Sequence, residues 1–162
     1  MNRNEEIIQI NGPAGVIEVL VENPGAPRGI ALVCHPHPLF GGTNTNKVTH
    51  ALARTFTRLG YVALRPNFRG VGNSSGVHDE GVGETEDMLV VLAEARRRFG
   101  DLPIALAGFS FGAYVQSCVA QALAEANHPA QRLVLVGTAA GHVEGARKYE
   151  TKAVASDTIV IH

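Results

Sequence analysis

The chain has 162 residues, of which 45% are hydrophobic and 18% are charged, and its formal net charge is -1 at pH 7. This length and composition predict one soluble globular domain over residues 1–162 with a single core. A net charge near zero creates no field that would attract nucleic acid or an anionic membrane surface, so we expect neither as a partner. Partners must be inferred from individual sites.

The sequence predicts a cytoplasmic protein. No apolar stretch reaches the roughly 18 residues of a membrane span, and residues 1–6 lack the basic and then apolar form of a signal peptide. Cys34 and Cys118 fall inside apolar runs, where a small buried thiol packs well, so both are predicted to be reduced.

The sequence predicts seven strands. Residues 6–10 and 16–22 are β-rich and are separated by a loop at residues 11–15 that contains two glycines and a proline, which indicates an N-terminal hairpin. Five later runs are apolar almost throughout, a pattern typical of parallel strands covered on both faces. These runs are residues 29–34, 61–64, 103–107, 132–136 and 158–161.

Three helices are predicted between these strands. The first has Val48, Leu52, Phe56 and Leu59 on one face and stops at Gly60. The second covers about residues 86–99 and is ended by Gly100; its buried positions are predicted to be Leu89, Leu92 and Phe99, and Arg96, Arg97 and Arg98 form a solvated face near its C-terminus. The third covers residues 111 to about 126 and is apolar on most sides. This alternation predicts the α/β class, with a mostly parallel, doubly wound sheet.

The most informative stretch is residues 103–113, where a buried strand passes through G-F-S-F-G into a helix. In such a turn the serine adopts a strained backbone conformation, so the positions two residues away on either side must be small. Gly108 and Gly112 meet that requirement, and Ser110 is the predicted nucleophile. The helix that follows directs its N-terminus at the site, so the N–H of Phe111 is predicted to stabilise an oxyanion.

A second oxyanion donor is expected in the loop of residues 35–42, which follows the third strand. Prolines at 36 and 38 have no N–H, which leaves the amides of His37, Leu39 and Phe40; we rank His37 first and Leu39 second. His35 and His37 could instead bind a metal, but no further ligand lies at suitable spacing, so a hydrogen-bonded structural role is favoured and no metal is expected.

The glycine-rich residues 65–76 permit a nucleotide-binding interpretation. A dinucleotide site needs its glycines to lead directly into a helix, and here residues 77–83 intervene. The acidic residues that follow are predicted to lie at the start of the second helix, where the helix dipole favours carboxylates, with a divalent cation site as a weaker alternative. They are Asp79, Glu80, Glu84, Glu86 and Asp87.

Taken together, the segments at 35–42, 69–76 and 108–112 resemble the α/β-hydrolase superfamily in order and spacing, closest to its small cofactor-free bacterial members near the dienelactone-hydrolase-like branch. The resemblance covers about residue 28 to the end. It implies a mostly parallel sheet, hydrolysis of an ester, thioester or amide, no cofactor, and a site made of Ser110, the Phe111 amide and one amide of the 35–40 loop.

One departure from the family concerns the rest of the catalytic machinery. The family's acid normally follows the seventh strand and its histidine follows the eighth, whereas this sequence ends at His162, in or just after the seventh. Since an isolated serine is a poor nucleophile, the chain as given is expected to be nearly inactive. We therefore predict a form truncated after the seventh strand of a protein about 50 to 60 residues longer, because the apolar last strand needs a neighbour and covering helices. Substitution by His35 or His37 is an alternative, although no acid is evidently placed to orient either ring.

The sequence thus predicts a serine hydrolase that forms an acyl-enzyme at Ser110 with a small or medium ester or thioester. Phe40 and Phe109 are candidate substrate contacts, although core packing explains Phe109 equally well. Because residues 138–156 are too few for a large cap, an open site is expected. The alternatives are a non-catalytic member of the fold that binds a ligand or partner, an inactive fragment, and a nucleotide-binding protein.

Overall fold

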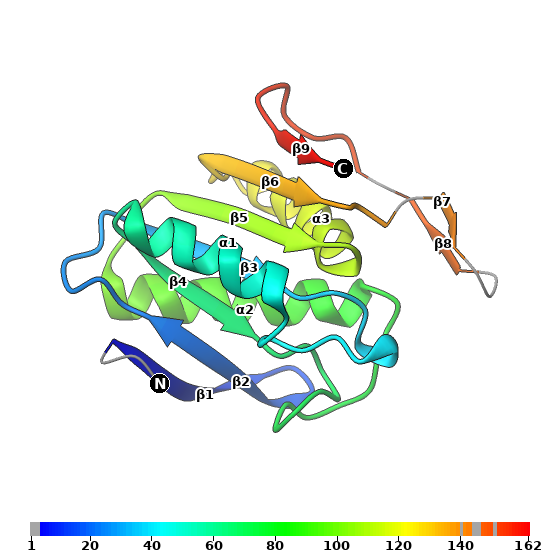
Figure 1. Cartoon of the computed structure of the whole chain (residues 1–162), viewed down its shortest axis with the longest axis horizontal. Helices are drawn as coiled ribbons and strands as arrows, with labels where there is room; N and C mark the ends of the chain where they lie inside the picture. The colour runs from blue at the N-terminus through cyan, green and yellow to red at the C-terminus, as the bar shows by residue number, and fades with distance from the viewer. Residues whose placement is uncertain (1–3, 140, 144–146, 151) are drawn as a thin grey trace.

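In the computed structural model, one seven-stranded sheet forms the centre of the protein (Figure 1), and the structure describes residues 4–139, 141–143, 147–150 and 152–162. The sheet contains β1 (Glu5–Gly12), β2 (Gly15–Glu22), β3 (Gly29–Cys34), β4 (Tyr61–Pro66), β5 (Ile104–Phe109), β6 (Arg132–Val136) and β9 (Ile159–Ile161). The helices are α1 (Lys47–Arg58), α2 (Val82–Phe99) and α3 (Phe111–Glu125), with a short 3-10 turn η1 (Pro38–Phe40).

The strand order is β1-β2-β4-β3-β5-β6-β9. β1, β2 and β4 pair antiparallel, and all pairs from β4 to β9 are parallel. The order reverses around β3, so the chain leaves β3 and β5 at the same edge of the sheet; in open α/β sheets, ligand sites lie at this edge. The predicted mostly parallel sheet with helices on both faces is confirmed.

The two faces of the sheet are packed differently. α1 covers one face, and α2 and α3 cover the other (Figure 1). The face under α1 presents small side chains, Ala31, Ala63, Ala105 and Ala107 among them. The opposite face carries larger ones, including Ile30, Leu32, Leu64 and Leu106. Both faces are therefore buried, which explains why the central strands are apolar at consecutive positions.

Several predicted boundaries were wrong. The hairpin strands extend inward to Gly12 and Gly15, leaving only Pro13 and Ala14 between them, because the ladder pairs every residue from Glu5↔Glu22 to Gly12↔Gly15. Leu59 lies beyond the end of α1 and is 53% exposed, while the buried face of that helix is Thr49, Ala53 and Phe56.

α2 begins at Val82, earlier than predicted, and its most buried apolar positions are Met88, Val91, Leu92 and Ala95. Leu89 and Phe99 are only partly buried. The sequence pattern also did not predict β7 (Gly141–Val143) and β8 (Arg147–Tyr149), a small antiparallel pair apart from the main sheet.

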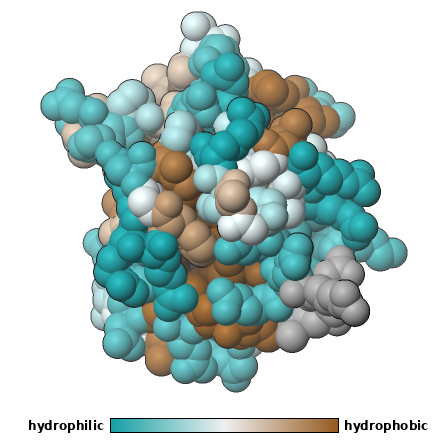
Figure 2. Space-filling model, turned by 90° about the vertical axis from the view of Figure 1, so that its left-hand side faces the viewer, coloured by the Kyte–Doolittle hydropathy of each residue, from teal (hydrophilic) through white to brown (hydrophobic). Residues whose placement is uncertain are grey.

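β9 forms the last edge of the sheet. Its three apolar side chains are 46–50% exposed. Figure 2 shows the surface at the left-hand side of Figure 1, where the parallel strands begin. This surface is covered mostly by hydrophilic residues with apolar areas between them. Among the described residues, no helix combines the length and apolarity needed to cross a membrane.

Candidate active site

Ser110 occupies a strained turn between β5 and α3. Its φ of 55° and ψ of -116° lie outside the regions that side chains other than glycine normally adopt. Surrounding backbone hydrogen bonds hold this conformation: the Ser110 N–H donates to the Val136 carbonyl at 2.8 Å, and the Ser110 carbonyl accepts the Ala113 N–H at 3.0 Å. Because such strain persists only where neighbouring structure enforces it, it points to a functional position. Ser110 is partly exposed at the carboxyl edge of the sheet.

The glycines on either side are required by close backbone approaches. A Cβ at Gly108 would lie 2.3 Å from the Gly112 carbonyl oxygen, and a Cβ at Gly112 would lie 2.4 Å from the Cys34 carbonyl oxygen. The second approach brings the start of α3 against the end of β3. The turn that carries Ser110 is therefore packed directly against the loop at residues 35–42.

The N–H of Phe111 is the first at the N-terminus of α3. Within the described part of the chain no atom accepts a hydrogen bond from it, and Ser110 caps the helix with no side-chain bond. An unpaired N–H at a helix N-terminus carries partial positive charge and can stabilise an anion. The position adjoins Ser110, as an oxyanion donor requires.

The loop at residues 35–42 folds back on itself around His37. Its carbonyl accepts the N–H groups of Phe40 and Gly42, both at 3.1 Å, and its Nδ1 accepts the N–H of Leu39 at 3.2 Å. The amides of Leu39 and Phe40 therefore already have acceptors inside the loop.

His35 has a structural role. Its side chain is fully buried, its Nδ1–H donates to the Pro36 carbonyl at 2.7 Å, and its Nε2 accepts the N–H of Phe68 at 3.0 Å. This arrangement requires the neutral ring, and burial lowers the pKa of His35 to about 4. His35 therefore ties the site loop to the strand end at Phe68 and has no nitrogen left for Ser110 or a metal ion.

The ring of His37 is also engaged. Its Nε2 lies 3.0 Å from the hydroxyl of Tyr149, and it packs against the rings of Phe40, His78 and Phe111 at centroid distances of 4.7–4.9 Å. With Nδ1 occupied by Leu39, neither nitrogen is directed at Ser110. The idea that His35 or His37 replaces the family's base is therefore not supported by the geometry.

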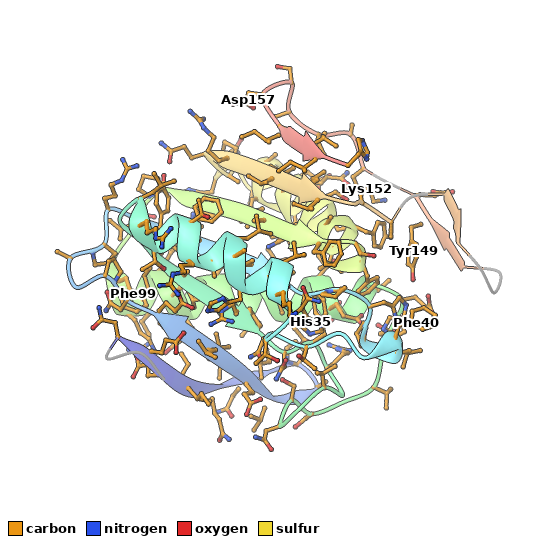
Figure 3. All side chains as sticks on the ribbon, viewed as in Figure 1. His35, Phe40, Phe99, Tyr149, Lys152 and Asp157 are labelled. Atoms are coloured by element: carbon orange, nitrogen blue, oxygen red, sulfur yellow. The ribbon has the colours of Figure 1, made fainter. Side chains whose placement is uncertain are left out.

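The two candidate substrate contacts lie in different settings. Phe40 is 68% exposed at the tip of η1, where its side chain projects from the loop (Figure 3). Phe109 is partly buried at the end of β5, and a Cβ at Gly137 would meet its ring at 3.3 Å. The exposed ring of Phe40 is accessible to a substrate, whereas the partly buried ring of Phe109 lies beside Gly137, just after β6.

The glycine-rich segment binds to the hairpin. Ser74 Oγ and Ser75 Oγ accept the N–H groups of Glu18 and Val16, both at 3.0 Å, so the segment is fixed to β2. The start of α2 is filled by carboxylates of the chain itself: Asp79 accepts the Gly83 N–H at 2.9 Å, and Glu84 accepts the Gly81 N–H at 3.1 Å. Because a phosphate would be repelled there, the arrangement does not suit a nucleotide.

Two members of the acidic cluster, Glu84 and Asp87, are buried, whereas Asp79, Glu80 and Glu86 are exposed. Glu84 is fully buried, and Asp87 is 2% exposed with both oxygens 2.8 Å from the guanidinium of Arg69. His78 lies against Glu84, with Nδ1 3.1 Å from Oε2. These contacts fix the loop before α2, and the spacing of residues in the sequence did not predict the Arg69–Asp87 pair.

One group of described side chains is close enough to hold a metal ion. Ligand atoms of Glu5, Glu22 and His50 lie within 4.8 Å of one another. However, Nη2 of the buried Arg65 lies 2.6 Å from Glu22 and 3.3 Å from Glu5. The guanidinium already supplies the positive charge these carboxylates need, so the group is best explained as an internal ion network.

The model of the alpha/beta hydrolase fold family matches residues 32–153, which include the site loop, Ser110 and the strands that carry them. The chain belongs to the α/β-hydrolase family. This agrees with the resemblance that the three motifs indicated.

Two solved structures similar to this α/β-hydrolase chain are bacterial. An α/β serine hydrolase without lid from Xanthomonas campestris is 28% identical, has a TM-score of 0.81, and is matched over 99% of this chain and 84% of its own. An α/β serine hydrolase homologue from Coxiella burnetii is 32% identical, with a TM-score of 0.76 and coverage of 99% and 88%.

A curated relative is also similar in sequence. An uncharacterized protein of Rickettsia prowazekii is 42% identical over 125 residues, which are 75% of this chain and 52% of the relative. The match therefore spans about half the length of that relative.

Proposed function

We propose that the protein is a serine hydrolase that cleaves a small or medium ester or thioester through an acyl-enzyme at Ser110. The observation that carries this proposal is the strained backbone of Ser110 beside an N–H of Phe111 that no described atom accepts. The first feature presents a hydroxyl, and the second stabilises the negative charge that forms when that hydroxyl attacks a carbonyl. The similarity to serine hydrolases from two bacteria supports the same reaction class.

In this proposal the oxyanion hole consists of the amides of Phe111 and His37. Leu39 contributes its side chain rather than its amide, because that N–H donates to His37. Leu39 and Phe40 are 63% and 68% exposed and give the loop an apolar surface, which suits an apolar acyl or alcohol group.

The site is proposed to be open. Between β6 and β9 the described structure contains only the short β7–β8 pair, and the Xanthomonas neighbour is described as lacking a lid. An open site accommodates soluble substrates of modest size. We place the protein in the cytoplasm in this proposal, as its composition predicted.

The test is turnover of p-nitrophenyl esters of increasing acyl length, together with an acyl thioester, by the full-length protein. We expect measurable hydrolysis of the short esters, and we expect Ser110→Ala to reduce kcat by a factor on the order of 10⁴ or more. Saturable binding of these compounds without turnover would instead favour a non-catalytic binding protein. Turnover that survives in Ser110→Ala would refute the assignment of the nucleophile.

A further inference from the structure

Tyr149 contacts the loop at residues 35–42, although the two are far apart in the sequence. It ends β8, 112 residues after His37, and points toward the loop that carries Phe40 (Figure 3). The side chain is 3% exposed. Its burial comes from contacts with the machinery around Ser110.

The hydrogen bonds of His37 determine where its proton resides. Nδ1 accepts the N–H of Leu39 at 3.2 Å, so it carries no hydrogen. The neutral ring must therefore hold its proton on Nε2, which then donates to the Tyr149 hydroxyl at 3.0 Å. The other tautomer would place two N–H groups against each other at Leu39 and leave the Tyr149 contact without that donor.

Tyr149 also contacts the other side of the site. Its ring lies 5.7 Å from that of Phe111 and 4.9 Å from that of Tyr114, both on the first turns of α3. The ring of His37 lies 4.9 Å from that of Phe111. Tyr149 thus touches both segments that supply the proposed oxyanion amides.

We propose that Tyr149 is a positioning residue of the oxyanion hole. By accepting the Nε2 proton of His37 it holds the ring in the orientation in which Nδ1 accepts the N–H of Leu39, and so it keeps the loop folded against Phe111. The inference rests on the proposed hydrolase function, which it extends by assigning a role to the segment between β6 and β9. Tyr149 does not touch the reacting atoms, so its effect is on geometry alone.

The test compares Tyr149→Phe with Tyr61→Phe in the full-length protein. Both substitutions remove one hydroxyl from a buried tyrosine that makes a side-chain hydrogen bond, since Tyr61 donates to Gln131 at 2.9 Å in another part of the protein. Long-range ¹H–¹⁵N spectra report the tautomer of His37, and ester hydrolysis gives kcat and KM separately.

We expect all three proteins to show the Nε2–H tautomer of His37, because the Leu39 N–H dictates it, and Tyr149→Phe alone to shift the Nε2 resonance of that ring. We also expect Tyr149→Phe to lower kcat about fivefold to tenfold with KM within about twofold, the size of effect that one supporting hydrogen bond has. An Nδ1–H tautomer in the parent, or a Tyr149→Phe protein with unchanged kcat, would overturn the inference alone. A parent with no turnover would overturn the proposed function, and this inference with it.

Discussion

Gly112→Ala is the substitution that most directly tests the packing of the turn that carries Ser110 against the loop at residues 35–42. The added Cβ would lie 2.4 Å from the Cys34 carbonyl oxygen and 2.5 Å from that of His35, about 1 Å inside the 3.4 Å at which ordinary contact begins. Both obstacles are backbone atoms at the buried end of β3. Neither can move without displacing the strand or the loop that follows it.

The expected loss of stability follows from this geometry. Overpacking a well-packed core typically costs about 1–3 kcal/mol, and two rigid carbonyls place this case at or above the top of that range. Against this loss, replacing glycine by alanine in a helix stabilises the folded state by about 1 kcal/mol. We therefore expect the free energy of unfolding to fall by at least about 2 kcal/mol, which lowers Tm by roughly 4–8 °C in a domain of this size.

Gln121→Ala is the control, measured beside Gly112→Ala by thermal unfolding followed by circular dichroism. Gln121 lies on the same helix α3 but is exposed, and its side chain bonds Glu125 about one turn away. We expect Gln121→Ala to change Tm by less than half as much. A Gly112→Ala protein that melts no lower than this control would show that α3 does not approach β3 as described.

Two further predictions concern buried charge. The pKa of His35 is lowered to about 4 in the folded protein, so as the pH falls below about 6.5 the unfolded chain binds a proton that the folded chain does not. We therefore expect the free energy of unfolding, measured in urea, to drop by about 2 kcal/mol from this residue between pH 7.5 and 5. His35→Gln cannot titrate and should remove that part of the dependence of stability on pH. An unchanged slope would mean that His35 is not buried in its neutral form. Asp87→Asn should cost about 2 kcal/mol, because it removes the buried carboxylate that pairs with the partly covered guanidinium of Arg69. Glu94→Gln, which breaks only exposed pairs, should change stability little, and equal effects in urea unfolding would contradict the difference in burial.

The sequence predicted the sheet and the strained turn at Ser110 because both have local signals. Parallel strands buried on both faces must be apolar at consecutive positions. The turn at Ser110 needs glycines two residues away on both sides, and the close backbone approaches at Gly108 and Gly112 agree with that requirement. Boundaries such as the start of α2 were less accurate, because Glu84 and Asp87 have charged side chains whose burial depends on partners elsewhere in the chain.

The support of the site could not be predicted from the sequence. The roles of His35 and His37 depend on Phe68 and Tyr149, which are 33 and 112 residues away. No periodicity or spacing encodes such pairs. The sequence offered three amides of the loop at residues 35–42 as a second oxyanion donor, but it could not show that the N–H of Leu39 donates to His37.

The most direct test of the central claim is to map the site of covalent reaction with a fluorophosphonate. The full-length protein should gain one adduct by intact mass, and peptide mass spectrometry should place it on Ser110. Ser110→Ala should gain none, while Ser117→Ala, which removes a buried hydroxyl from the same helix, should react like the parent. An adduct on another residue, or one that persists in Ser110→Ala, would contradict the claim that this strained turn carries the nucleophile.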